Sequence, residues 1–109
     1  MSQLADKVKA RLDDETQSAW VKLLNDPAGR LVIWSLLDMT HVFQSSLSLD
    51  LAQMAALEGE RNIGLRILNE RILPANPKAL GDLMAENATR EQEIERAIEK
   101  DEAEKEIGL

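Results

Sequence analysis

The sequence contains no cysteine and no tyrosine, with only one phenylalanine, two tryptophans and one histidine. The absence of cysteine excludes disulfides, thiolate catalysis and every zinc site that uses thiolate ligands. A single histidine, His41, provides neither a second imidazole ligand nor an evident nucleophile to activate, so a structural role at the end of a helix is expected for it. With so few aromatic residues the core must be mainly aliphatic, which favours helices over sheets. The sequence therefore predicts an all-α protein that is not an enzyme and needs no cofactor or metal.

Long apolar runs are also missing. The longest one, residues 31–37 with Ser35 inside it, is far shorter than the ~20 residues that cross a bilayer. The first residues do not combine a basic segment with a following apolar one, so no secretory signal is expected. We expect a protein that is made in the cytoplasm and has no transmembrane segment.

Positive charge is scarce, because the sequence has 13 basic and 20 acidic residues and a net charge of −7. Direct nucleic-acid binding usually requires a basic stripe, and is not expected here. The densest basic patch, residues 7–11, is followed at once by the three acids of residues 13–15. Residues 86–106 carry nine acidic and four basic side chains, so most of the excess charge lies near the C-terminus.

The spacing of apolar residues predicts four helices. Asp26 and Pro27 suit the cap and first turn of the second helix, and Ser48 or Asp50 suits the cap of the third. Pro74 should end the third helix, because proline disfavours helical geometry in the residue before it. The second helix is apolar nearly all round, which is typical of the most buried helix. The predicted ranges are residues 2–25, 27–42, 51–73 and 77–106, with a serine-rich loop at residues 44–48.

The third helix has two different faces. Arg61 projects into the larger apolar stripe, where Glu58 is its natural partner three residues away. We expect an internal ion pair that orients helices, because an unpaired buried charge is costly; the alternative is that Arg61 faces a carboxylate of a partner protein. The stripe consists of Leu51, Met54, Leu57, Leu65, Leu68 and Ile72.

Small residues mark the other side of this helix and its middle. Ala52, Ala56, Gly59 and Gly64 would let a second helix approach closely. Each glycine costs about 1 kcal/mol relative to alanine inside a helix, and close packing is the simplest compensation. The third helix is therefore predicted to lie between two neighbours.

The last predicted helix is apolar at its start and highly charged beyond residue 87. Ile94 and Ile98 are among the few apolar residues there, and we expect them to contact a partner. The alternatives are a solvated helix or an acidic surface that imitates nucleic-acid phosphates. The sequence thus predicts a domain of three packed helices over residues 1–76 and an acidic, projecting C-terminal helical arm over residues 77–109.

Three blocks carry a resemblance to a known family. They are residues 26–34 (DPAGRLVIW), residues 41–46 (HVFQSS) and residues 58–65 (EGERNIGL). Together they resemble short virion-associated helical proteins encoded in the structural modules of short-tailed bacteriophages, or podophages, over about residues 20–73. An aromatic residue often precedes the Glu-Gly pair in that family, whereas Leu57 stands there in this sequence.

The resemblance implies a non-enzymatic phage protein of the virion, synthesised in the host cytoplasm. Portal, tail or internal virion proteins are the implied partners, and a homo-oligomer or many copies would suit so small a chain. It would assemble at the portal or tail vertex, or be packaged internally and released with the genome. Two alternatives stay open: an assembly factor (scaffold or chaperone) absent from the mature particle, and an acidic inhibitor of a host nucleic-acid-binding protein.

Overall fold

The computed structural model describes residues 3–44 and 50–108, and these residues contain helices and no strand. The all-α prediction, with a long C-terminal helix, is confirmed. In chain order the elements are α1 (Gln3–Leu24), α2 (Pro27–Met39), α3 (Leu51–Ile67), the π-helical turn η1 (Leu68–Ile72), α4 (Leu73–Ala75) and α5 (Ala79–Glu106).

Aspartates cap two of the helices, as expected. The side chain of Asp26 accepts a hydrogen bond from the Gly29 amide before α2, and Pro27 occupies the first turn, where an N–H group is not needed. Asp50 accepts from the amides of Ala52 and Gln53 before α3. Ser48, the alternative cap, and most of the predicted serine-rich loop lie outside the described residues.

The third helix ends close to the predicted Leu73, but it continues through Pro74 and does not stop before it. Helical structure continues from α3 through η1 and α4 to Ala75. The turn before the proline widens, and the Leu73 amide donates to the Leu68 carbonyl, five residues back. Such π-helical turns change the register of backbone hydrogen bonds within a helix, and here the change directly precedes a residue that has no amide hydrogen to donate.

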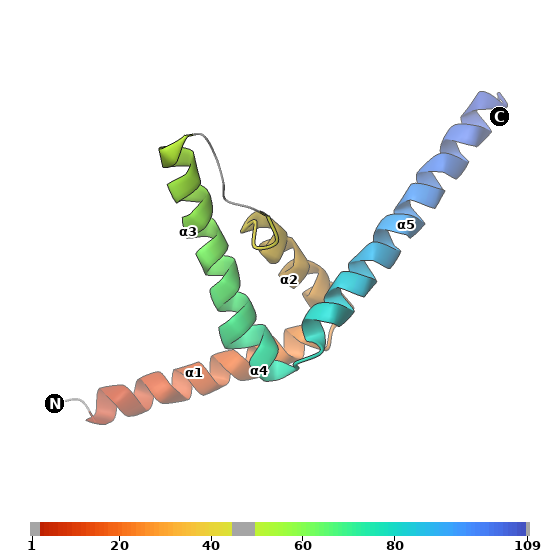
Figure 1. Ribbon diagram of the computed structural model, residues 1–109. Coiled ribbons are helices and arrows are strands. Elements are labelled where there is room, and N and C mark those ends of the chain that lie inside the picture. The colour runs from red at the N-terminus through yellow and green to blue at the C-terminus, as the bar shows by residue number, and fades with distance from the viewer. Residues whose placement is uncertain (1–2, 45–49, 109) are drawn as a thin grey trace.

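Figure 1 shows an open arrangement. Helix α1 crosses the base of α3 and α4, α2 rises beside α3, and α5 projects away on the side opposite the N-terminus. The radius of gyration is 19.5 Å, whereas a compact domain of this length has one of about 13 Å. The molecule measures 75 × 40 × 22 Å along its principal axes, so much of it extends beyond any common core.

The core lies where the end of α1, α2, η1 and the beginning of α5 meet. It is small and aliphatic, as the composition predicts, and Trp20 and Trp34 pack against it from outside. Trp34 also stacks on Phe43, with 5.7 Å between ring centroids. The buried apolar residues are Ile33, Leu37, Val42, Leu68, Ile72, Ala79 and Leu83.

Helix α2 has more buried residues than any other described helix, as predicted, although it is not buried all round. Its neighbours lie on one side, where Ile33 and Leu37 are inaccessible to solvent. On the other side Val32, Leu36 and Met39 are exposed, Met39 to 69%. The hydrophobic pattern correctly identifies apolar faces, but the chain itself covers only one of them.

Both long helices extend beyond the core as exposed arms. We call residues 3–12 the α1 arm and residues 91–106 the α5 arm, since every residue in both ranges is exposed. Ala79 and Leu83 are buried in the core, so α5 packs on the core at its start and projects beyond these residues. The division into units at residues 1–76 and 77–109 stays a prediction.

Candidate functional site

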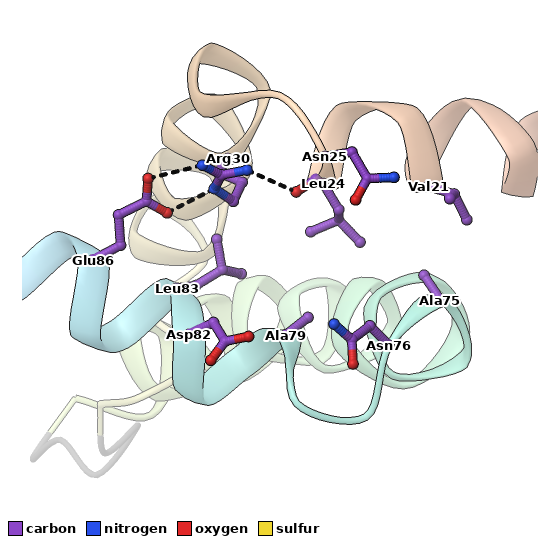
Figure 2. Close-up of a pocket in the computed structure, with 10 residues that line it drawn as sticks. All are labelled: Val21, Leu24, Asn25, Arg30, Ala75, Asn76, Ala79, Asp82, Leu83 and Glu86. Carbon is purple, nitrogen blue, oxygen red and sulfur yellow. Dashed lines mark hydrogen bonds and ion pairs between the residues drawn. The ribbon is translucent and has the colours of Figure 1, made fainter.

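A cleft lies at the junction of α1, α2, α4 and α5, and Figure 2 shows its lining. Its volume is about 360 Å³. Apolar side chains from α1 and α5 form part of the lining, together with the polar side chains of Arg30 and Glu86. The lining residues are Val21, Leu24, Asn25, Arg30, Ala75, Asn76, Ala79, Asp82, Leu83 and Glu86.

Arg30 joins three helices at this cleft. Its Nε and Nη2 atoms donate to the two carboxylate oxygens of Glu86 on α5, at 2.7 and 3.2 Å. Its Nη1 atom donates to the carbonyl of Leu24 at the end of α1, at 3.1 Å (Figure 2). A two-pronged contact of this kind fixes the orientation of both side chains as well as their distance.

The ion pair changes the proton affinity of both groups. The hydrogen bond from Arg30, followed by its positive charge, lowers the pKa of Glu86 below its ordinary value. The same hydrogen bond raises the pKa of Arg30. Both side chains are about 30% exposed or less, and Arg90 lies 3.6 Å from the same carboxylate. Glu86 therefore keeps its negative charge to lower pH than an unpaired glutamate does.

The close approach of α1 and α2 depends on Gly29. A Cβ atom there would overlap the carbonyl oxygen of Leu23 and lie 2.9 Å from its Cα atom. Because the obstacle is backbone, no side-chain movement relieves the overlap. In residues 26–30 the chain thus combines a helix cap, a first-turn proline, a contact glycine and the clamping arginine.

A second polar junction holds α1 against the π-helical turn. Arg71 Nη2 donates to Asp13 at 2.8 Å, and Gln17 Nε2 donates to the Arg71 carbonyl at 3.0 Å. These contacts lie just after the α1 arm and fix the direction in which it leaves the core. Sequence reasoning missed both junctions, because their partners are 54 to 58 residues apart.

Gly64 packs closely against the segment that follows α2. A Cβ atom there would overlap Thr40 Oγ1 and lie 2.8 Å from Val42 Cβ. The other three positions predicted for close packing differ: Ala52, Ala56 and Gly59 are exposed, and a Cβ at Gly59 would have no heavy atom within 4 Å. Their prediction is wrong, because within residues 3–44 and 50–108 no second helix covers these three positions.

Glu58 and Arg61 form a pair, but not an internal one. Arg61 Nη1 lies 3.8 Å from Glu58 Oε1, with the two side chains 36% and 44% exposed. The expected burial in an apolar stripe is wrong, because the first half of that stripe extends beyond the core; Leu51, at its start, is 79% exposed. Whether Arg61 faces a partner stays a prediction.

His41 lies directly after α2 in a left-handed backbone conformation, with φ of 56°. Its Nδ1 atom is 2.7 Å from Glu60 Oε2 on α3. Histidine is among the residues that adopt this conformation more readily than most. The contact links the end of α2 to α3, in keeping with the structural role expected for His41.

The two arms present apolar residues to solvent. On the α5 arm, Ile94 and Ile98 are 52% and 50% exposed and line a shallow hollow with Glu91, Glu95 and Glu99. On the α1 arm, Leu4, Val8 and Leu12 are exposed, Leu4 to 76%. The partner-binding role of Ile94 and Ile98 stays a prediction.

Among the described residues, no group of three or more acidic or histidine side chains is placed to hold a metal ion. Over the same residues, no helix is both long and apolar enough to cross a membrane. The arrangement at the cleft is suited to holding three helices at fixed angles, which in turn sets the directions of the two arms.

Comparison with known proteins places this core in a family. No curated protein and no solved structure matches the chain. A family model described as Bbp19-like phage protein matches residues 20–85, from the tryptophan on α1 that packs on the core to the turn of α5 next to Glu86. The matched region is more than half of the chain and leaves both arms outside. The chain therefore belongs to the family of Bbp19-like phage proteins.

Proposed function

We propose that this phage protein is a non-enzymatic structural component of a short-tailed phage particle. It assembles in several copies with other virion proteins at the portal or tail vertex, or is packaged internally and leaves with the genome. Its role is to present helical surfaces in fixed directions, and the Arg30–Glu86 contact sets those directions.

The observation that carries this proposal is the amount of exposed apolar surface. Among residues 3–44 and 50–108, sixteen large apolar side chains are exposed, whereas seven apolar residues are buried. They include the outer face of α2 and both arms. Monomeric proteins rarely leave large contiguous apolar surfaces open to water, and such surfaces usually mark interfaces. A component whose faces are covered by neighbouring subunits accounts for this distribution.

The experiment is quantitative mass spectrometry of purified particles of the phage that encodes the chain, before and after genome ejection. Presence in both samples supports a fixed portal or tail component, and presence only before ejection supports an internal, released protein. The major capsid protein is the matched control, since it stays with the particle in both samples. Absence from both samples would refute the proposal.

The acidic α5 arm favours a second candidate. Eight acidic and three basic side chains project from residues 91–106, all of them exposed. An inhibitor that imitates nucleic-acid phosphates would use such a surface to block a host protein. The same acidic composition would also suit an assembly factor that is absent from the mature particle. Charge imitation loses affinity steeply as salt rises, whereas an apolar docking interface does not. Absence from particles together with steep salt dependence of host-protein binding would favour the inhibitor.

A further inference from the structure

We propose that copies of this chain join head to tail, with the α1 arm of one copy packing against the α5 arm of the next. The inference deepens the proposed function, on which it rests, by naming a second copy as the partner of both arms.

The α5 arm has an apolar centre and an acidic edge. Ile94 and Ile98, one helical turn apart, lie on one face. Glu91, Glu95 and Glu99 follow the same spacing beside them and frame the hollow. An occupant of this surface must offer aliphatic side chains at helical spacing and positive charges next to them.

The α1 arm has those properties. Leu4, Val8 and Leu12 recur every four residues and therefore form one stripe along the helix. At about 100° per residue, Lys7 and Arg11 fall along one edge of this stripe and Lys9 along the other. An apolar stripe between basic side chains complements an apolar centre with an acidic edge.

The charges of the two arms are opposite overall. The α1 arm carries three basic side chains and one acidic, a net of +2, whereas the α5 arm carries three basic and eight acidic, a net of −5. Opposite potentials favour correct encounter and disfavour pairing of two α5 arms, which repel one another.

The two arms of one molecule do not meet. They leave the core on opposite sides, and the first turn of α1 and the last turn of α5 lie far apart (Figure 1). The Arg71–Asp13 and Arg30–Glu86 contacts hold these directions. The α1 arm therefore reaches an α5 arm only in another copy. A contact between two different surfaces repeats from copy to copy and closes into a ring or continues as a filament.

The test uses two variants of the full chain, each defective in one arm. Leu4→Glu/Val8→Glu places negative charge on the α1 arm, and Ile94→Glu/Ile98→Glu does the same on the α5 arm. Sedimentation velocity is measured over a range of protein concentrations for each variant, for an equimolar mixture and for the wild type. We expect the wild type to exceed its monomer mass of 12.2 kDa as concentration rises. Each variant alone should associate at least about 100-fold more weakly, because it loses two apolar contacts and places two carboxylates in the apolar centre of the interface.

The mixture distinguishes head-to-tail joining from other modes. One variant keeps its α5 arm and the other its α1 arm, so together they should form a one-to-one dimer that grows no further. Raising the salt concentration should weaken this dimer. A mixture that stays monomeric, a single variant that associates like the wild type, or a wild type that is monomeric throughout would overturn the proposal.

Matched controls place a glutamate on the far face of the same helices, with Ala10→Glu on the α1 arm and Ala103→Glu on the α5 arm. Both positions are exposed, so these changes should leave association within about threefold of the wild type. Circular dichroism of all variants verifies that helical content is retained. The presence of the protein in phage particles tests the proposed function separately. A failure of arm pairing in solution does not change that test, and absence from particles does not change the sedimentation result.

Discussion

Alanine at Gly64 should destabilise the protein, whereas alanine at Gly59 should stabilise it, although both glycines lie within α3. In each case alanine removes the conformational cost of glycine in a helix, a gain of about 1 kcal/mol. At Gly59 nothing lies within 4 Å of the new methyl group, so the gain is kept. At Gly64 the methyl group would overlap Thr40 and approach Val42 to 2.8 Å.

The cost at Gly64 follows from the nature of these neighbours. Thr40 and Val42 are β-branched and have little rotational freedom at χ1. Thr40 Oγ1 also donates to the Leu37 carbonyl at 2.8 Å, a contact that is lost if the side chain turns away. Overpacking of this kind costs about 1–3 kcal/mol. The free energy of unfolding of Gly64→Ala should therefore lie about 1–3 kcal/mol below that of Gly59→Ala.

Urea denaturation followed by circular dichroism measures the difference, with all proteins at one concentration because association shifts apparent stability. In thermal melting, the gain at Gly59 corresponds to a rise of roughly 4–8 °C. Gly81→Ala is a matched control in α5, since a Cβ there also meets nothing within 4 Å. Equal stabilisation by all three alanines would refute the close approach of α3 to the segment after α2.

Glu86→Gln should reduce the loss of stability in acid. The pKa of Glu86 is lower in the folded protein than in the unfolded chain, so the unfolded chain binds a proton more readily. The ion pair with Arg30 therefore stabilises the fold at pH values above the ordinary pKa of glutamate. That contribution is lost as pH falls through the lowered value, and a urea-denaturation series across this window should show a shallower slope for the variant. Arg61→Leu should change the free energy of unfolding by less than about 1 kcal/mol, because the pair it breaks is half exposed; a loss of several kcal/mol in urea denaturation would contradict that exposure. A chain that ends after Arg90 should melt within a few degrees of the full chain, because the removed residues 91–108 are all exposed; loss of cooperative melting would show that the arm supports the core.

Local features of the fold could be predicted from the sequence. The caps at Asp26 and Asp50, the first-turn Pro27 and the approximate helix ranges follow from interactions within a few residues. Pro74 is an exception. The rule that proline ends a helix assumes regular hydrogen bonding before it, and the π-helical turn departs from that regularity.

The long-range arrangement could not be predicted in the same way. Periodicity shows which face of a helix is apolar, but not whether the same chain covers that face. For α2 the pattern correctly predicts the most buried helix, but the apolar outer face is uncovered and Met39 is 69% exposed. The prediction that Glu58 and Arg61 form an internal pair is wrong for the same reason.

The candidate site was missed for a related reason. Arg30 was visible within a sequence block, and Glu86 within the acidic segment, but nothing local joins residues 56 positions apart. A signal does exist: Gly29 and Arg30 together, directly after a helix cap, indicate a helix start that approaches another backbone and has a charged partner elsewhere.

The unbroken course of α5 has a mechanical consequence. Beyond Glu86 the helix continues for twenty residues to its last one, Glu106, and this part is about 30 Å long at 1.5 Å per residue. A tilt of about 10° at its base would therefore displace its tip by about 5 Å. Arg30 and Glu86 lie at the base of this projecting helix. A neighbouring subunit that shifts their contact slightly would therefore move the far end of the helix by about the length of a side chain.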